Sequence, residues 1–466
     1  MAQSIAALDL GTSKSIAVVA KKDFAGKLSV LRTEMLPSKS AIRRGRIYNS
    51  DEVSGIISKL IRKLNASPET MQIEKIYVGI GGQSLHTQLF KVKRPVETGT
   101  VTQLLLDSME EEATAYTSDF EENLGVVSCE YYADGQMVSI PKGTVASAIE
   151  ARFQLIVGNP CLKRNLKTVL SNNNEVSVAG YFVSPLATAE AVLTSEEKES
   201  GCALIEFGDG VTYISIYKNK ALKYLATLPL GGLTITKDIR SLNVSEEEAE
   251  ALKIEHGSVL LESTDNDAIL TTKGELNTLR TIEMKHLNWV IEARVDEIIK
   301  NAWSQIQNSG YSQTINAGIV ITGGGALLRN LPQYIRNLTE KEVRLADAKA
   351  KINYPDNHLS PADSCVIGLA LLGKENCLKE SVILPKEKER TLFGDEVKKV
   401  KTEEKTINKE KVDETPKPPR GSIFGKSWKK IQKTFDKGVS LFEEEEAENN
   451  KDDKDDNKND NTANKQ

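Results

Sequence analysis

Short apolar runs and amphipathic stretches alternate along most of this chain, which predicts a fold of strands and helices. The segments SIAALDLG (4–11), SIAVVAKK (15–22) and KIYVGIGG (75–82) have the apolar character of buried strands. Apolar residues recur at helical spacing in 51–64, and a longer helix is predicted over 284–307. Ser245, followed three residues later by Glu248, is typical of a helix N-terminus, so a helix is also expected over 245–253. This alternation predicts the α/β class.

The pattern changes between residues 83 and 159, where few glycine turns occur. An acidic helix is expected over 104–117, with strands over 126–132 and 146–151. We interpret 83–159 as an inserted small α+β subdomain. The strand and helix alternation resumes in 176–193, and 212–232 reads as a hairpin whose turn is the KNK triplet.

Apolar periodicity is lost after residue 384. Residues 386–421 are rich in Lys and Glu and contain a P-K-P-P run, so they predict a disordered charged linker. Residues 422–442 then regain helical spacing, and 443–466 form an acidic low-complexity tail that we expect to be disordered.

The segment 422–442 predicts an amphipathic helix with two stripes. Large apolar side chains are spaced by three or four residues and share one face: Phe424, Trp428, Ile431, Phe435, Val439 and Phe442. A basic stripe lies beside it: Lys426, Lys430, Lys433 and Lys437. This composition favours a helix that lies in a membrane interface next to anionic lipids, and a partner-docking helix is the alternative.

Composition narrows the possible functions. The 466 residues exceed what one hydrophobic core usually supports, so at least two domains are expected. Five cysteines without a C-x-x-C pair argue against a disulfide framework or a zinc site and favour a reducing compartment. Neither an export signal nor a spanning stretch is recognised, and the net charge of −5 gives no support to nucleic-acid binding.

Three glycine-rich turns, each after an apolar run, carry the candidate chemistry. They are ALDLGTSKS (7–15), ALIEFGDGVT (203–212) and IVITGGGALL (319–328). Glycine lets backbone N–H groups approach an anion without an intervening Cβ, so three such turns can hold one nucleotide.

In this order, the turns resemble the two phosphate motifs and the adenosine motif of the actin, Hsp70 and sugar-kinase superfamily. Residues 178–193 and 360–373 are similar to the two connecting helices of that fold. The segment LPLGGLTITKDI (228–239), the insertion after Gly82 and the terminal amphipathic helix are similar to the FtsA family of bacterial cell-division proteins.

The resemblance implies an actin-like two-domain fold with duplicated mixed β-sheets flanked by helices. The first domain core would comprise 1–82 and 160–193, the inserted subdomain 83–159 and the second domain 194–385. The linker, the membrane-targeting helix and the tail would then follow at 386–421, 422–442 and 443–466.

The resemblance also implies ATP and Mg²⁺ as ligands, with Asp9 organising the hydrated metal. The nucleotide-binding residues would be Asp9, Gly11, Thr12, Ser13, Lys14, Glu206, Gly208, Gly210, Thr212, Glu250, Lys253, Gly323, Gly324 and Gly325. Glu250 and Lys253 are equally consistent with an exposed helix pair. Implied partners are FtsZ, further copies of the chain, lipids of the cytoplasmic membrane face and later division proteins.

The second turn departs from the family pattern. Glu206 stands where the pattern has Asp, and Asp209 adds a negative charge where phosphate is expected. Ser184 stands where many relatives carry a Glu or Gln that orients the attacking water, so slow or absent hydrolysis is expected. An ATPase or kinase on the same fold, or another actin-like scaffold, is the alternative function.

Overall fold

The computed structural model describes residues 3–38, 40–66, 72–173, 175–260, 269–273, 279–353 and 359–379. The predicted linker, membrane-targeting helix and acidic tail lie outside the described residues. Among the helices of the described ranges, none has both the length and the apolar character needed to cross a bilayer.

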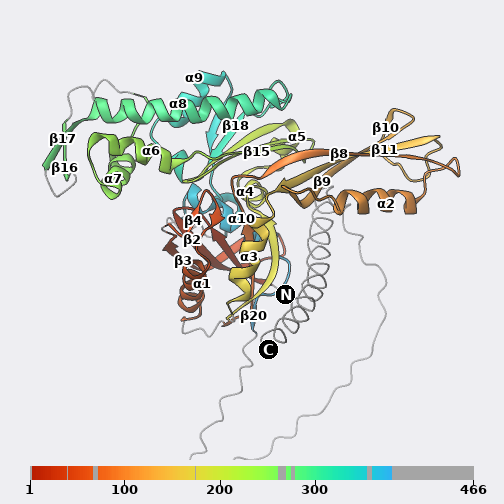
Figure 1. The fold of residues 1–466 in the computed structure, drawn as a ribbon, viewed down its shortest axis with the longest axis horizontal. Coiled ribbons are helices and arrows are strands. Elements are labelled where there is room, and N and C mark those ends of the chain that lie inside the picture. The colour runs from red at the N-terminus through yellow and green to blue at the C-terminus, as the bar shows by residue number, and fades with distance from the viewer. Residues whose placement is uncertain are drawn as a thin grey trace, which may run out of the picture.

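Two five-stranded mixed sheets repeat one topology. The first has the order β12-β7-β1-β2-β3 and the second the order β15-β14-β13-β18-β19. In each, three consecutive strands pair antiparallel, a fourth strand pairs in parallel with the first of them, and a fifth strand pairs in parallel with the fourth. The predicted duplication of mixed sheets is therefore confirmed (Figure 1).

The predicted apolar runs correspond to β1, β2, β7, β13 and β18 and the predicted hairpin to β14 and β15, whereas β3 and β19 were not anticipated from the sequence. The first sheet consists of β1 (Gln3–Leu10), β2 (Lys14–Lys22), β3 (Leu28–Pro37), β7 (Lys75–Ile80) and β12 (Ser177–Val183). The second consists of β13 (Cys202–Phe207), β14 (Thr212–Lys218), β15 (Ala221–Leu228), β18 (Ile319–Thr322) and β19 (Val343–Leu345). The hairpin turn between β14 and β15 has Asn219 at φ 52° and Lys220 at φ 61°, which is the left-handed geometry of tight hairpins.

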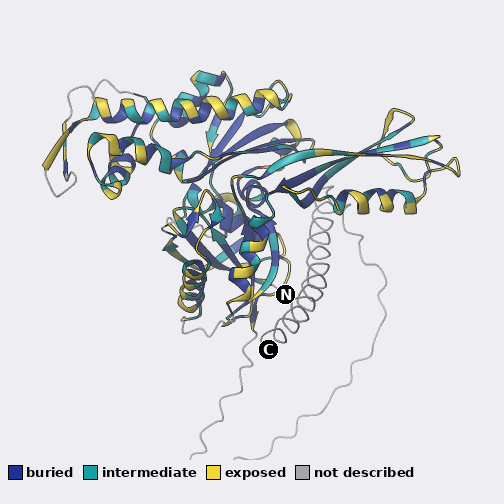
Figure 2. Ribbon diagram, in the orientation of Figure 1, coloured by how far each residue is buried: buried dark blue, intermediate teal, exposed yellow. Residues whose placement is uncertain are grey.

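Helices cover the outer faces of both sheets. The first sheet carries α1 (Ser50–Asn65) and α3 (Cys161–Ser171); the second carries α6 (Gly232–Ile239), α7 (Glu246–His256), α8 (Met284–Asn308) and α9 (Leu331–Thr339). The predicted helices 51–64, 245–253 and 284–307 correspond to α1, α7 and α8, and Ser245 caps α7 by accepting from the backbone N–H of Glu248. Figure 2 shows α8 with one buried face and an exposed outer face.

Two apolar helices, α4 (Ser184–Val192) and α10 (Ser364–Leu372), pack against each other between the sheets (Figure 1). A Cβ at Gly368 would lie 1.8 Å from the carbonyl oxygen of Ala187, so the two backbones are in direct contact. The segment 178–193 is helical only from Ser184 onwards, because its first part is β12 (Ser177–Val183), an edge strand of the first sheet, and Pro185 stands in the first turn of the helix.

Residues 86–158 form a third sheet with its own core. Its order is β10-β9-β11-β8, and it consists of β8 (His86–Pro95), β9 (Glu122–Ala133), β10 (Gln136–Val138) and β11 (Ala148–Gly158), covered by α2 (Gln103–Thr114). The hydroxyl of Thr227 on β15 donates to the carbonyl of Leu85 at 2.6 Å, which ties this unit to the second sheet. The domain boundaries themselves stay a prediction.

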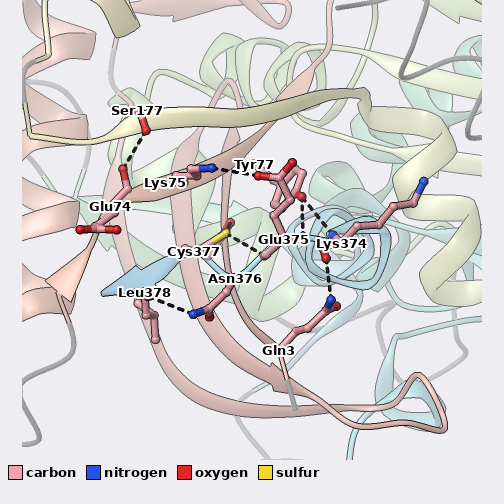
Figure 3. A network of polar contacts seen from close by, with 11 residues as sticks. Gln3, Glu74, Lys75, Tyr77, Ser177, Lys374, Glu375, Asn376, Cys377 and Leu378 are labelled. Atoms are coloured by element: carbon pink, nitrogen blue, oxygen red, sulfur yellow. Dashed lines mark hydrogen bonds and ion pairs between the residues drawn. The ribbon is translucent and has the colours of Figure 1, made fainter. Parts of the chain in front are cut away.

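Short elements complete the fold and close it. They are β4 (Ile42–Arg43), β5 (Arg46–Ile47), β6 (Gln72–Ile73), α5 (Ser195–Ser200), η1 (Arg240–Leu242), β16 (Ile269–Lys273), β17 (Leu279–Glu283), η4 (Gly324–Leu327), η5 (Lys349–Lys351), η6 (Pro361–Asp363) and β20 (Leu378–Lys379). β20 pairs with β6, and the residues before it bond to β1 and β7 through the polar network of Figure 3.

Candidate functional site

A cavity of about 370 Å³ lies where the glycine turns of the two sheets meet. This volume falls within the range of about 300 to 1,000 Å³ that is usual for small-molecule sites. Its lining includes every predicted nucleotide-binding residue except Thr212: Asp9, Gly11, Thr12, Ser13, Lys14, Glu206, Gly208, Gly210, Glu250, Lys253, Gly323, Gly324 and Gly325.

The first two turns have the same backbone geometry. The N–H of Gly11 donates to the carbonyl of Lys14 at 3.1 Å, and the N–H of Gly208 donates to the carbonyl of Val211 at 3.0 Å. Within the described part of the chain, four backbone N–H groups of these turns find no acceptor: those of Thr12, Ser13, Asp209 and Gly210. Such groups are the donors that an anion requires.

The two turns touch each other across the cavity. A Cβ at Gly210 would lie 2.5 Å from the hydroxyl oxygen of Thr12, so only glycine fits there. That hydroxyl oxygen also accepts from the backbone N–H of Gly45 at 3.0 Å, in the turn between β4 and β5. The first two glycine turns are therefore in direct contact beside the cavity.

The third turn requires glycine for packing against β13. Gly323 has φ 91°, and a Cβ there would lie 2.5 Å from the carbonyl oxygen of Phe207. A Cβ at Gly325 would lie 2.6 Å from the ring of Phe207. Phe207, which the sequence pattern did not single out, thus sets the position of this turn.

Two carboxyl groups stand at equivalent strand ends, Asp9 on β1 and Glu206 on β13. Burial raises the pKa of Asp9, and the Cys365 thiol, which donates to Asp9 Oδ1 at 3.3 Å, lowers it in part. Burial, with the charge of Asp9, raises the pKa of Glu206 to about 8. Glu206 Oε2 has no hydrogen-bond partner among the described residues.

Asp209, which adds the unexpected charge, faces the lysine of α7. Burial raises the pKa of Asp209 to about 6, and Lys253 opposes this shift. The Lys253 ammonium donates to the carbonyl of Gly232 at 3.1 Å, to Thr236 Oγ1 at 2.8 Å and to Glu250 Oε2 at 2.6 Å. Lys253 is buried and pairs with Glu250, whose side chain is 41% exposed, in the i, i+3 arrangement; a contact of either residue with nucleotide stays a prediction.

Lys14 and Thr212 have partners that the sequence did not predict. Lys14 Nζ lies 3.0 Å from Asp363 Oδ1, just before α10. Thr212 is fully buried and its hydroxyl donates to the carbonyl of Leu230 at 2.9 Å, so it supports the turn from behind and does not line the cavity.

Several cavity residues were missed because they carry no motif of their own. Ser184 begins α4, as anticipated for the connecting helix, but the sequence had not placed Tyr213, Gly232, Ile254, Leu327, Ala362 or Cys365 in the lining. Ile254 is adjacent to Lys253 on the same helix, which is the one signal that pointed to it.

Comparisons with known proteins agree with this architecture. A family model described as cell division protein FtsA matches residues 203–368. Cell division protein FtsA of Porphyromonas gingivalis is 31% identical over 381 residues, which span 80% of this chain and 78% of the relative. Cell division protein FtsA of Bacillus subtilis is 27% identical over 354 residues, spanning 73% of this chain and 77% of the relative.

A solved structure shares the fold without close sequence similarity. The structure titled PilM-PilN type IV pilus biogenesis complex aligns with a TM-score of 0.56, over 79% of this chain and 97% of that chain, at 13% identity. With the repeated mixed sheets and this level of identity to curated relatives, the chain belongs to the FtsA family of cell division proteins and has its actin-like fold.

Proposed function

We propose that this protein is an actin-like adaptor of bacterial cell division, which binds ATP with Mg²⁺ and holds FtsZ filaments at the cytoplasmic face of the cell membrane. The observation that carries the proposal is 31% identity over 80% of the chain to a protein named cell division protein FtsA. Recruitment of later division proteins and self-association belong to the same proposal.

The cavity is chemically suited to a nucleotide. The free N–H groups of both turns, together with Lys14, would bind the phosphates, and Gly323, Gly324 and Gly325 would lie under the adenosine. Asp9 would hold water ligands of Mg²⁺, which supplies positive charge beside the phosphates. Thr236 and Lys253 hold Glu250 in place, so Glu250 is the side chain fixed for contact with the ribose.

The charge of the lining favours the magnesium complex over free ATP. Four acidic residues line the cavity, Asp9, Glu206, Asp209 and Glu250, and they outnumber the lysines Lys14 and Lys253 even when Glu206, with its pKa of about 8, is protonated. Free ATP carries further negative charge, so a divalent cation is needed to offset the repulsion. We therefore expect calorimetric ATP affinity to fall at least about tenfold when Mg²⁺ is replaced by EDTA, and Asp9→Asn to reduce this dependence on Mg²⁺.

The membrane contact is assigned to residues 422–442 on their sequence pattern alone. One amphipathic helix binds a bilayer reversibly, and several linked copies bind firmly. Self-association of the folded part would supply those copies. The two halves of the chain would therefore act together, with the tethered helix holding the actin-like body at the membrane.

Liposome co-sedimentation tests the membrane contact. We compare the full chain, a chain that ends at Arg420, and the double variant Trp428→Glu, Phe435→Glu on vesicles that contain anionic lipid. The matched control is Thr434→Glu, Ser440→Glu, which adds the same charge away from the apolar stripe. Pelleting of the full chain and of the control, but not of the other two, is expected.

A second arm of the experiment adds purified FtsZ. If the adaptor function holds, FtsZ pellets with the vesicles only when the full chain or the control variant is present. A full chain that stays in solution at low salt would make residues 422–442 a partner-docking segment, and the anchoring role would be withdrawn.

A further inference from the structure

The ammonium of Lys14 is paired with the carboxylate of Asp363, 349 positions further along the chain. Lys14 Nζ lies 3.0 Å from Asp363 Oδ1, and the side chains are only 28% and 13% exposed. Lys14 begins β2 directly after the first glycine turn, and Asp363 directly precedes α10. In the described ranges, no other carboxylate lies within ion-pair distance of Lys14.

Asp363 is fixed in position independently of Lys14. Its Oδ2 accepts from the backbone N–H of Ser360 at 2.9 Å and from the Ser360 hydroxyl at 3.0 Å. The adjoining carbonyl of Pro361 accepts from the N–H of Gly323 at 3.3 Å, in the third glycine turn. One carboxylate oxygen is thus committed to the backbone, and the other is presented to Lys14.

The Asp363 carboxylate therefore contacts the Lys14 ammonium, which is the cation that the first glycine turn provides for a phosphate. Asp9 is near enough to feel both charges of this pair. Lys14 lowers the pKa of Asp9 and Asp363 raises it. A phosphate bound at the first turn would meet Lys14 from within the cavity, and Asp363 would then be a second anion beside the same ammonium.

We infer that Asp363 competes with the nucleotide phosphate for Lys14 and so lowers the affinity of the site. The inference rests on the proposed nucleotide binding and deepens it, since it names the residue that sets the affinity. Binding of ATP exchanges the Asp363 contact for a phosphate contact. Asp363 keeps its bonds to Ser360 throughout, so α10 and the third turn need not move.

The test compares ATP affinity, measured by titration calorimetry with Mg²⁺, in the full chain and four variants. Asp363→Asn keeps an oxygen for Ser360 but loses the charge, so the fold is expected to persist, which thermal melting checks. The other variants are Lys14→Met, the double variant with both changes, and Asp347→Asn. Asp347 is the matched control because it also pairs with a lysine, Lys349 at 3.3 Å, and accepts a backbone N–H.

Asp363→Asn is expected to tighten ATP binding by about 3- to 30-fold, the range that a half-buried ion pair spans. Asp347→Asn is expected to bind as the unaltered chain does. Lys14→Met should bind more weakly, and adding Asp363→Asn to it should give no further gain, because the competed group is absent.

The possible failures are distinct. Unchanged or weaker binding by Asp363→Asn, while the unaltered chain binds ATP, overturns the competition and leaves the nucleotide proposal intact. A gain of the same size in the Lys14→Met background also overturns it, because the charge would then act directly on the nucleotide. Absence of ATP binding in all five proteins overturns the nucleotide proposal and the inference together.

Discussion

At the scale of single residues, the departure of Glu206 from the family pattern changes the charge of the cavity less than the sequence suggests. The longer side chain leaves Oε2 buried without a partner in the described structure, and burial raises the pKa of Glu206 to about 8. A carboxyl group with that pKa holds its proton at neutral pH. The lining is therefore less negative than a count of acidic residues indicates.

This protonation has a measurable consequence for stability. Between its ordinary pKa of 4.5 and about 8, Glu206 binds more protons in the folded than in the unfolded chain, so its contribution to stability is lost as pH rises through that window. Glu206→Gln removes the loss. We expect its unfolding free energy, relative to the unaltered chain, to rise by up to about 4 kcal/mol between about pH 5 and pH 8.5.

Urea denaturation without nucleotide or metal measures this difference. The control is Glu199→Gln, whose exposed side chain pairs with Lys220 at the surface. A Glu206→Gln profile parallel to that of the unaltered chain would mean that Glu206 is ionised in the folded state.

The sequence located the glycine turns that line the cavity, but it did not predict the contacts that their side chains make. The turns at 7–15, 203–212 and 319–328 identified the cavity because glycine and charge patterns are local. The contact of Lys14 with Asp363 spans 349 positions, and no local pattern encodes it. Thr212 was misplaced because strand alternation after Val211 turns its side chain behind the turn, where it bonds to Leu230.

At the scale of elements, the contact between α4 and α10 joins the two halves of the fold. All residues of α10 and all of α4 except Glu190 are buried, as expected for helices that lie between two layers. Gly368 permits the contact, because a Cβ there would lie 1.8 Å from the backbone oxygen of Ala187. The distance between α4 and α10 is therefore set by direct contact between their backbones.

Gly368→Ala tests this contact against a matched glycine. The added methyl must displace one helix, so we expect a loss of about 3 kcal/mol in unfolding free energy. Gly55 lies inside α1 with open space around its position, and Gly55→Ala is expected to stabilise by about 0.5 to 1 kcal/mol. Equal melting temperatures for Gly368→Ala and the unaltered chain would show that the helices can separate at no cost.

Amphipathic elements were predicted closely, and buried ones were not. The apolar stripe of α1 located both of its ends within one residue, and the Ser245 cap located the start of α7, which ends three residues beyond the predicted 253. Residues 178–193 are mostly apolar and show neither a strand nor a helix period clearly, so periodicity could not show that β12 ends and α4 begins at Ser184.

At the scale of the whole molecule, the last described residues, 374–379, attach to strands β1 and β7 of the first sheet. The backbone N–H of Cys377 donates to the carbonyl of Ser4 on β1 at 2.7 Å, and Lys75 on β7 pairs with Glu375 at 3.0 Å. Tyr77 accepts at its hydroxyl from the backbone N–H groups of Lys374 and Glu375, each at 3.0 Å (Figure 3). The predicted linker begins at residue 386, shortly after this network in the sequence, so a pull from the proposed membrane-bound helix would reach the fold here.

Tyr77→Phe should weaken the attachment of residues 374–379 to the first sheet without disturbing the core. The phenylalanine ring would keep the stacking on Phe182, whose centroid lies 5.5 Å away, while both backbone donors lose their acceptor. We expect hydrogen–deuterium exchange in 374–379 to accelerate by about 5- to 10-fold, which corresponds to the loss of roughly one net hydrogen bond. Tyr48→Phe, at an exposed tyrosine, is the control and should leave exchange unchanged.

The exchange pattern separates two ways of holding the chain. Faster exchange confined to 374–379 would mean that the hydrogen bonds to the Tyr77 hydroxyl help to hold this segment, which precedes the predicted linker, against the first sheet. Unchanged exchange would mean that the other contacts, the pairing of β20 with β6 and the backbone bond of Cys377 to Ser4 among them, hold the segment without the Tyr77 hydroxyl. In that case Lys379 and its neighbours, and not Tyr77, would be where a membrane tether pulls on the fold.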